Sequence, residues 1–370
     1  MNFLDLKKQQ NRIIKGVKKR FDNIFSHGAY IMGPEIDELE EKLAKYCGVK
    51  HAISCSSGTD ALLIPLMAWD VGPGDAVFTT PFTYVATAEV ISLLGATPVF
   101  IDVYDSTFNI DCEKLEKTIK ATVKEGKLTP KAIIPVDLFG VPARYRLIES
   151  IAIKYNLKVV EDAAQSFGGS IRNRKVGSFG DVAATSFYPA KPLGCYGDGG
   201  AIFTNDDHLA EKCKAIRVHG TGSDKYNSEV IGLNGRLDSM QAAVLLEKLT
   251  IFDEELIMRN KINGYYRKNI DNAQYIPNNY HSAHALFSIT LDSHQQRERL
   301  INSLNDNQIP NVIYYKYPIH LMKGFSYLGY KDGDFPVSEN LSQTIVSLPM
   351  HPYLNEEDID LIANVLKDNE

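Results

Sequence analysis

The chain has 370 residues, 44% of them hydrophobic, which is enough to bury a large core and to form more than one domain. Its 40 basic and 46 acidic residues give a formal charge of -6 without a block of like charges, so a nucleic acid is not expected as a partner. The longest apolar stretch, 90–101, is interrupted by Gly95 and Pro98 and is too short to cross a bilayer.

The first predicted elements lie near the start of the chain. Gly33 and Pro34 are typical of a helix N-cap and a first helical position, and apolar residues follow at helical spacing up to Leu43. The run 51–55 predicts a strand. A turn of small residues then leads into a helix that we expect to begin near Thr59.

Short apolar runs alternate with longer helical patterns up to about residue 205. We expect a helix over 83–94 and further strands over 76–80, 98–103, 131–136, 158–160, 183–187 and 201–204. Buried strands that alternate with helices predict an α/β fold with a mostly parallel sheet and helices on both of its faces.

The pattern changes in the last third of the chain. One long helical pattern covers 237–268, followed by a strand-like run over 284–291, a charged helix over 296–305 and a terminal helix. A helix of this length could bridge two domains. We therefore expect a large domain over 1–250 and a smaller C-terminal α/β domain over 251–370.

The cysteines and the N-terminus indicate the compartment. Five cysteines, an odd number without a C-x-x-C pair, are typical of reduced thiols, and no metal site is predicted. The N-terminus is charged and rich in Gln, unlike a signal peptide. We expect a cytoplasmic protein without a membrane partner.

Lys191 is the most informative single residue. It lies between Pro189 and Pro192, and Pro192 biases it away from helical geometry. A lysine aimed by a stiffened loop at the end of an apolar strand can be desolvated and made nucleophilic, as a Schiff base to an aldehyde cofactor requires. The alternative is an ordinary solvated loop lysine.

The turn 56–59 follows a strand and opens a helix. Amide groups at a helix start, beside Ser and Thr hydroxyls and the flexible Gly58, suit a phosphate group. The alternative is an ordinary helix N-cap. Ser186, at the end of the strand before Lys191, could donate a hydrogen bond to the same phosphate as Thr59. Otherwise it is a buried serine bonded to the local backbone.

Asp162 follows the predicted strand 158–160. Ligands of open parallel sheets bind beyond the carboxyl ends of the strands, where Asp162 should lie. A carboxylate there could pair with a protonated pyridine nitrogen, and Gln165 would be placed to hydrogen-bond the other ring substituents. The alternative is that Asp162 caps the next helix. The segment 81–84 adds aromatic residues that could stack on a flat cofactor or pack in the core, and 197–200 predicts a turn into the next strand.

Together these motifs resemble those of the DegT/DnrJ/EryC1/StrS family of pyridoxal-phosphate sugar aminotransferases. The matching segments occur in the family's order and cover nearly the whole chain: 57–62, 81–87, 161–165, 186–200, 234–238 and 317–318. The resemblance implies the type I aminotransferase fold. It also implies a homodimer whose active sites are shared between the subunits.

The resemblance also implies roles for individual residues. Lys191 resembles the Schiff-base lysine, Asp162 the partner of the pyridine nitrogen, and Gln165 the contact near the ring hydroxyl. The remaining cofactor residues are implied to be the phosphate ligands Gly58, Thr59 and Ser186, the ring-stacking Tyr84, and Asn234 lent by the neighbouring subunit. Arg236, Lys316 and Tyr317 resemble contacts to a sugar nucleotide.

The resemblance is strongest to the branch that aminates C-3 of UDP-2-acetamido-2-deoxy-3-oxoglucuronate for surface polysaccharides such as the O-antigen of lipopolysaccharide. Two residues depart from the common pattern: Lys316, where many members carry His, and Asp137, where many carry His or Ser. Lys316 could meet a uronate carboxylate or a diphosphate as a point charge, or lie in solvent.

The implied reaction has two halves. L-Glutamate converts pyridoxal phosphate to pyridoxamine phosphate, which then aminates the UDP-linked keto sugar. Lys191 favours amino transfer, because the family's dehydratases carry histidine at this position. Two alternatives remain: an enzyme of the same family acting at C-4 or on a dTDP- or GDP-linked sugar, and a non-catalytic regulator that binds pyridoxal phosphate.

Overall fold

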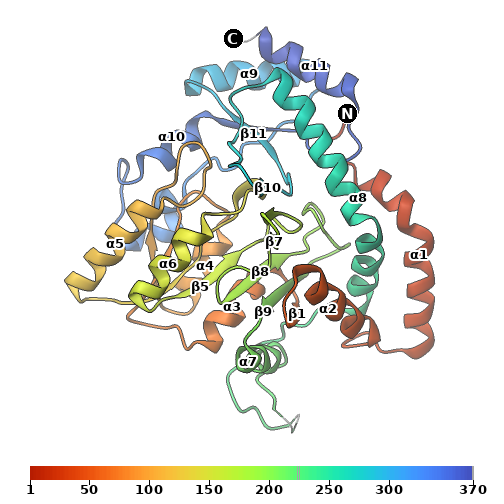
Figure 1. Ribbon diagram of the computed structural model, residues 1–370, viewed down its shortest axis with the longest axis vertical. Helices are drawn as coiled ribbons and strands as arrows, with labels where there is room; N and C mark the ends of the chain where they lie inside the picture. The colour runs from red at the N-terminus through yellow and green to blue at the C-terminus, as the bar shows by residue number, and fades with distance from the viewer. Residues whose placement is uncertain (223, 225, 369–370) are drawn as a thin grey trace.

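A seven-stranded sheet forms the centre of the larger part of the molecule (Figure 1). The computed structural model describes residues 1–222, 224 and 226–368. The strand order is β1-β9-β8-β5-β4-β2-β3, and every neighbouring pair from β8 to β3 is parallel, whereas β9 is antiparallel to β8 and β1. The mostly parallel sheet is thus confirmed. Its strands are β1 His51–Cys55, β2 Asp75–Thr79, β3 Thr97–Phe100, β4 Thr129–Ile133, β5 Lys158–Asp162, β8 Val182–Ser186 and β9 Gly200–Thr204.

Helices cover both faces of this sheet, as predicted. Successive strand residues point to opposite faces, so Val77 packs with the first group of helices and Phe78 with the second. The first group is α3 Gly58–Ala68, α4 Ala86–Leu93 and α7 Asp207–Arg217. On the other face lie α5 Cys112–Glu125, α6 Tyr145–Tyr155, α2 Pro34–Cys47 and α8 Ser239–Asn269.

The C-terminal part forms a second, smaller core. The antiparallel pair β11 Phe287–Thr290 and β12 Ile345–Leu348 packs with α9 His294–Asp306, α11 Glu356–Lys367 and the end of α8. Figure 1 shows α1 Leu6–His27 running beside α8. In the described part of the chain, no helix combines the length and apolar character needed to span a membrane.

Short elements complete the structure. They are the strands β6 Ser170–Ile171, β7 Arg174–Lys175 and β10 Tyr280–His281, the 3-10 helices η1 Leu138–Gly140, η2 Ile319–Leu321 and η3 Lys323–Leu328, and the helix α10 Pro336–Thr344. Among the boundaries expected from the sequence, α2 does begin at Pro34 after Gly33, and β9 begins at Gly200, one residue before the predicted strand 201–204.

Several boundaries differ from prediction, among them those of α4, β3 and β4, and β4 spans Thr129–Ile133 rather than 131–136. Helix α4 begins at Ala86 rather than 83, and the Thr83 hydroxyl instead lies 3.3 Å from that of Thr87. Strand β3 ends at Phe100 rather than 103. The Asp102 carboxylate that follows it accepts hydrogen bonds at the start of α10, including one of 2.9 Å from the Ser338 amide.

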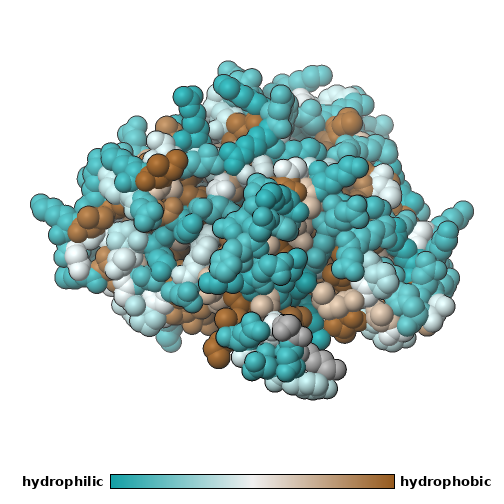
Figure 2. Space-filling model, turned by 60° about the horizontal axis from the view of Figure 1, so that its bottom comes forward, coloured by the Kyte–Doolittle hydropathy of each residue, from teal (hydrophilic) through white to brown (hydrophobic). Residues whose placement is uncertain are grey.

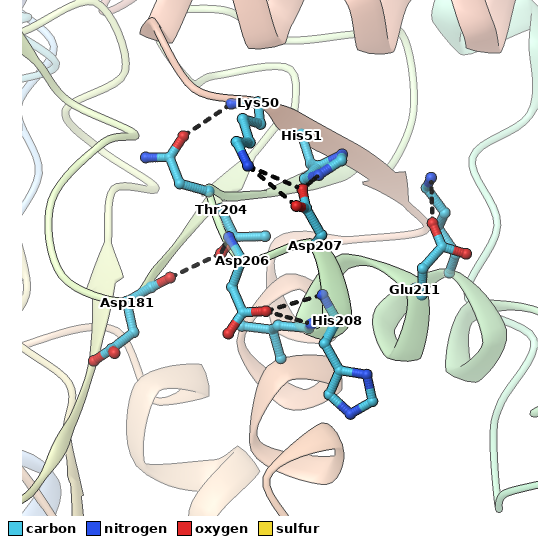
Figure 3. A network of polar contacts seen from close by, with 11 residues as sticks. Lys50, His51, Asp181, Thr204, Asp206, Asp207, His208 and Glu211 are labelled. Carbon is cyan, nitrogen blue, oxygen red and sulfur yellow. Dashed lines mark hydrogen bonds and ion pairs between the residues drawn. The ribbon is translucent and has the colours of Figure 1, made fainter.

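A network of polar contacts joins α7 to the sheet (Figure 3). It lies at the start of β1 and the end of β9, far from the site described below. There, His51 pairs in register with Thr204. Asp206 accepts hydrogen bonds of 2.9 and 3.0 Å from two amides in the first turn of α7. The Asp207 carboxylate contacts Lys50 Nζ at 3.1 Å and His51 Nε2 at 2.7 Å. The network therefore holds α7 against the sheet edge.

Candidate active site

The carboxyl ends of three strands bring the predicted site residues to one edge of the sheet. Asp162 ends β5, Ser186 ends β8, and Ser57 follows the end of β1. These strands point the same way, because β5 is parallel to β8 and β1 is joined to β8 through the antiparallel β9. This is the edge where open α/β sheets bind ligands.

Asp162 is only 4% exposed and is held by two donors. Its carboxylate accepts hydrogen bonds from Thr87 Oγ1 at 2.9 Å and from the Ala164 amide at 3.2 Å. Burial raises the pKa of Asp162, while these two donors and the charge of Lys191 lower it. A turn rather than a helix follows Asp162, so the alternative that it caps the next helix is wrong.

Lys191 lies in the tight loop between β8 and β9. Its amide donates to the Tyr188 carbonyl at 2.9 Å, and the Cys195 amide returns to the Phe187 carbonyl at 2.7 Å. Gly194 permits this closure, because a Cβ there would lie 2.5 Å from the Tyr188 carbonyl oxygen. Lys191 is half-buried. Burial lowers the pKa of its ammonium group, and the charge of Asp162 raises it in part. The alternative of a freely solvated lysine is therefore wrong.

The start of α3 lies against Ser186. A Cβ on Gly58 would be 2.6 Å from Ser186 Cβ, so the turn and the end of β8 are in direct contact. Ser57 caps the helix by accepting a hydrogen bond of 3.0 Å from the Asp60 amide. Ser186 Oγ accepts one of 3.2 Å from the Tyr188 amide, which leaves its own hydrogen free to be donated. The first amides of a helix have no partner within the helix, so this corner can receive an anion.

Gln165 joins the sheet edge to the C-terminal part of the chain. Its Oε1 accepts a hydrogen bond of 2.9 Å from the Phe139 amide, and its Nε2 donates one of 3.0 Å to the Tyr315 hydroxyl. The Tyr315 ring also packs edge-on against Phe82, with ring centroids 6.0 Å apart. Burial raises the pKa of Tyr315, so its hydroxyl stays protonated at neutral pH. Asp162 and Tyr84 are near enough for their charges to act on it.

The structure adds Thr87 and Tyr315 to the residues predicted from the sequence. Thr87 lies in the segment 81–87 that resembles the family, but the resemblance gave no role to its hydroxyl group. Tyr315 directly precedes Lys316 and Tyr317, which were predicted instead. The only sequence signal for it is the aromatic pair 314–315.

Lys316 and Tyr317 are exposed and line a separate cavity. Lys316 Nζ lies 5.6 Å from the centroid of the Tyr317 ring, within the range of a cation–π contact. The cavity has a volume of about 400 Å³, and its walls also include Pro318, Glu339 and Asn340. A space of this size is within the range of small-molecule binding sites.

Two predicted residues, Asn234 and Arg236, do not join this cluster within one chain. Asn234 Oδ1 accepts a hydrogen bond of 2.8 Å from Arg236 Nε, and the two side chains pair with each other on the surface. The Gly235 carbonyl between them accepts a hydrogen bond of 2.9 Å from the Ser56 amide. This segment therefore lies next to the turn that begins α3. Tyr84 is 58% exposed and lies near Tyr315.

Asp137 lies behind Asp162 and is fully buried. Its amide donates to the Asp162 carbonyl at 3.1 Å. Its carboxyl group accepts hydrogen bonds of 2.8 Å each from the Tyr145 hydroxyl, the Ser166 hydroxyl and the Ala143 amide. Burial raises the pKa of Asp137, and it also raises the pKa of Glu161, a second fully buried carboxyl group that lies beside it, so the two acids share one titration.

We expect Asp137→Asn to flatten the pH dependence of stability. The folded protein holds a proton on the buried pair of Asp137 and Glu161, and the unfolded chain releases it above the ordinary pKa values of 3.8 and 4.5. The stability from this group is therefore complete below about pH 4 and is lost as pH rises through about 7, up to about 4 kcal/mol. Urea unfolding at pH 5 and pH 8 should show a smaller difference for the variant than for the wild type. Asp111→Asn, the same change at the N-cap of α5, should leave the wild-type difference, and an unchanged difference in Asp137→Asn would contradict this interpretation.

Comparison with known proteins agrees with this geometry. The sequence model of the DegT/DnrJ/EryC1/StrS aminotransferase family matches residues 11–367. The chain is 43% identical to a UDP-2-acetamido-2-deoxy-3-oxo-D-glucuronate aminotransferase of Pseudomonas aeruginosa, over 99% of both chains. It is also 40% identical to a pleiotropic regulatory protein of Geobacillus stearothermophilus, over 96% of this chain and 94% of that one.

Solved structures give the same result for the fold and the cofactor. A DegT/DnrJ/EryC1/StrS aminotransferase from Brucella abortus superposes with a TM-score of 0.96 at 48% identity, covering 100% of this chain and 99% of the other. NtdA from Bacillus subtilis, solved with bound pyridoxamine phosphate, superposes with a TM-score of 0.85 at 26% identity, covering 97% and 82%. The chain has the type I fold of pyridoxal-phosphate enzymes. It belongs to the DegT/DnrJ/EryC1/StrS family of pyridoxal-phosphate-dependent sugar aminotransferases.

Proposed function

We propose that this protein transfers the amino group of L-glutamate to the C-3 keto carbon of a UDP-linked sugar, a 2-acetamido-2-deoxy-3-oxoglucuronate, for surface polysaccharide biosynthesis in the cytoplasm. The observation that carries the reaction type is Lys191, half-buried beside the charge of Asp162 with its pKa lowered by burial. The choice of sugar is supported by the 43% identity to the Pseudomonas aeruginosa relative.

The residues at the sheet edge fit the cofactor. The start of α3, with Gly58 and Thr59, and the Ser186 hydroxyl form a corner of free donors that suits its phosphate group. The buried carboxylate of Asp162 suits a protonated pyridine nitrogen, since a charged partner would offset the burial that raises its pKa. When bound, the cofactor supplies an electron sink for negative charge on the carbon next to the transferred nitrogen.

The other groups of the chain then have defined tasks. Lys191 would hold the cofactor through its amine and would carry the proton that is moved during the reaction, for which a lowered pKa is an advantage. Asp162 keeps the ring nitrogen protonated. Gln165 hydrogen-bonds near the ring hydroxyl, with its orientation held by Tyr315. Tyr84 offers its exposed ring to the ring of the cofactor.

The cavity beside Lys316 and Tyr317 is the proposed place for part of the sugar nucleotide. Its volume of about 400 Å³ suits a ligand of that size. Lys316 can meet a uronate carboxylate or a diphosphate as a point charge, which explains why a cation rather than histidine is found there. Arg236 is proposed as a further contact from the neighbouring subunit.

A homodimer with shared sites is part of this proposal. Ile31 bridges to Asp238, so the segments 30–32 and 234–238 lie side by side. Exposed apolar side chains occur in α1, in the segment 30–32 and at 230–231, and Figure 2 shows apolar surface at the lower edge of a mostly hydrophilic face. The exposed apolar residues are Phe25, Tyr30, Ile31, Met32, Val230 and Ile231. Covering this surface with a second copy would bring Asn234 to the phosphate of the partner's site.

The packing of α8 supports a division into two domains near residue 250, with Phe252 still in the core of the large sheet. The first half of this helix, including Leu245 and Leu246, packs with the large sheet. Its second half, including Ile262 and Tyr266, packs with β11, β12 and the terminal helices. We therefore propose residues 1–250 as the large cofactor-binding domain and 251–370 as the small domain.

A product panel tests the proposed function. Purified enzyme is incubated with L-glutamate and a set of UDP-, dTDP- and GDP-linked 3-keto and 4-keto sugars, and amino-sugar products are identified by mass spectrometry. We expect the UDP-linked 3-keto uronate to be aminated with the highest kcat/KM. Preference for a 4-keto or a dTDP-linked sugar would favour the alternative substrate, and the absence of any product would contradict amino transfer.

A regulator without turnover is the second candidate, because one relative at 40% identity is named a pleiotropic regulatory protein. Single-turnover experiments separate the two. A regulator would bind pyridoxal phosphate but give no amino sugar with any keto substrate, even after releasing one equivalent of 2-oxoglutarate. The enzyme proposed above would cycle repeatedly.

We expect Gly58→Ala to weaken cofactor binding about tenfold or more. The new Cβ would lie 2.6 Å from Ser186 Cβ, so the two walls of the phosphate corner must separate, and hydrogen bonds to a charged group are lost with about this magnitude. Titration of the cofactor-free protein with pyridoxal phosphate, followed by absorbance, measures the effect. Gly72→Ala is the control, because a Cβ there meets only one atom, at 3.9 Å. Equal affinities for both variants would contradict the assignment.

A further inference from the structure

Asp137 is bonded to both segments that carry the proposed contacts to the cofactor ring. Its amide donates to the Asp162 carbonyl at 3.1 Å, and the Asp162 amide donates to the Pro135 carbonyl at 3.0 Å. Its carboxyl group accepts a hydrogen bond of 2.8 Å from the hydroxyl of Ser166, the residue after Gln165. The backbone at Asp162 and the backbone at Gln165 are therefore both fixed from Asp137.

The same carboxyl group closes the loop that holds the end of the Gln165 side chain. It accepts a hydrogen bond of 2.8 Å from the Ala143 amide, so the segment 137–143 forms a closed turn. Within this turn the Phe139 amide donates to Gln165 Oε1 at 2.9 Å. Asp137 therefore acts on Gln165 from both sides, through the residue that follows it and through the donor to its side chain.

Glu161 places a second acid against Asp137, and the two form an acid pair. Glu161 directly precedes Asp162 in β5, and its carboxyl group accepts hydrogen bonds from the Gly177 amide at 3.1 Å and the Phe179 amide at 2.9 Å. Both acids are fully buried, and their carboxyl groups lie within hydrogen-bonding reach of each other. Among the described residues, no lysine, arginine or histidine nitrogen lies within ion-pair distance of either acid. Two negative charges are not both stable in such a place, so the acid pair keeps a proton between its carboxyl groups.

The groups around the acid pair do not supply a compensating positive charge. The titratable side chains that face it are Tyr145 of α6, Tyr280 of β10, Cys47 of α2 and Asp162. Burial raises the pKa of both tyrosines and of the cysteine, so these three groups stay neutral near neutral pH. Lys175 of β7 acts on Cys47, but its Nζ lies over the Tyr46 ring, 3.7 Å from the ring centroid. Loss of the shared proton would therefore leave two charges beside the carboxylate of Asp162, and their repulsion would move the backbone that carries Asp162 and Gln165.

We propose that the acid pair positions the active site: its shared proton keeps Asp162 and Gln165 in the arrangement that receives the cofactor ring. The site binds the cofactor while the pair holds this proton, and it loosens when the pair releases the proton as pH rises. The inference rests on the proposed function, since it assumes that Asp162 and Gln165 contact the ring. It goes beyond that function by giving a task to Asp137, one of the two residues that depart from the common family pattern.

The pH dependence of pyridoxamine phosphate binding to the cofactor-free protein tests this proposal. This form of the cofactor has no aldehyde, so it does not bond to Lys191. For the wild type we expect the dissociation constant, measured by calorimetry, to rise about tenfold for each pH unit above the titration of the acid pair, as for a ligand that binds only the protonated form. Asp137→Asn puts a neutral amide in place of the shared proton, so this rise should be absent. Glu161→Gln should give the same result.

Asp111→Asn is the matched control, because the Asp111 carboxylate caps α5 by accepting from the Glu113 and Lys114 amides. It should keep the wild-type rise with pH, which also accounts for the titration of the ligand itself. The infrared spectrum gives a second measurement that a merely structural role would not change. The wild type should show the band of a buried protonated carboxyl group at neutral pH, and Asp137→Asn should weaken it.

Thermal melting shows which variants are folded, and Glu161→Gln decides if Asp137→Asn does not fold. A wild-type rise with pH in the folded variants of the acid pair would overturn the proposal, and so would a wild type without the infrared band. A wild-type protein that binds no pyridoxamine phosphate at any pH would refute the cofactor site itself, which is a different outcome.

Discussion

Replacing Lys191 with alanine is expected to lower the rate of amino transfer by at least about 10³-fold, the range of a lost general acid–base. In the proposed function Lys191 is the amine that holds the cofactor and the group that moves the proton, and it lies near enough to Asp162 to feel its charge. The purified wild-type protein should be yellow and its absorbance should shift on adding glutamate. The variant should lack the colour of bound cofactor. Absorbance and the rate of 2-oxoglutarate release measure both effects.

Two further lysine variants serve as comparisons for Lys191→Ala. Lys191→Arg keeps a positive charge but cannot be deprotonated, so it should be as inactive as the alanine variant. Lys248→Met removes another buried ammonium group, whose pKa burial lowers to about 8 and which faces the Tyr196 ring. It should retain activity within about tenfold of wild type, since it removes no group that moves the proton. A colourless Lys191→Ala variant that still turned over substrate would refute the assignment.

We expect Asp162→Asn to reduce the rate about 10²- to 10³-fold, the magnitude of one lost electrostatic contact in an active site. The amide keeps the shape of the side chain and the hydrogen bond from Thr87, but it removes the charge that would keep the pyridine nitrogen protonated. Stability should not fall, because burial already disfavours the charged form of Asp162. Single-turnover kinetics and thermal melting of the cofactor-free protein measure the two effects.

Thr87→Val separates charge from hydrogen bonding at the same carboxylate. The valine removes the 2.9 Å donor to Asp162 but leaves its charge, so a loss of only about tenfold is expected, in line with one hydrogen bond to a charged group. If Asp162→Asn kept the wild-type rate with the cofactor bound, Asp162 would not act on the pyridine ring. If Thr87→Val were the slower of the two, positioning rather than charge would be the main contribution of this side chain.

Features that depend on local chemistry could be read from the sequence. The strand 51–55 and the helix start at Pro34 agree with the structure to the residue, because alternating burial and a Gly-Pro cap are properties of neighbouring residues. The loop of Lys191 was recognisable for the same reason, since proline restricts its own backbone and that of the residue before it. Placement of Asp162 required only the rule that parallel strands end at one edge of a sheet.

Features that depend on contacts between distant segments were decided by the tertiary structure. Thr87 reaches Asp162 across 75 residues, and Gln165 reaches Tyr315 across 150, so neither pair leaves a periodic signal in the sequence. Gln9 of α1 bonds to Glu255 of α8 across 246 residues, so no motif in the sequence predicted this contact. By itself the sequence determined the mostly parallel sheet and the helix start at Pro34, because these follow from local backbone restriction and the burial pattern, whereas the role predicted for Lys191 came from its resemblance to the family. Only the tertiary structure decided which side chains desolvate that lysine and its carboxylate partner, because burial and the pKa shifts that it causes arise from atoms brought together by the whole fold.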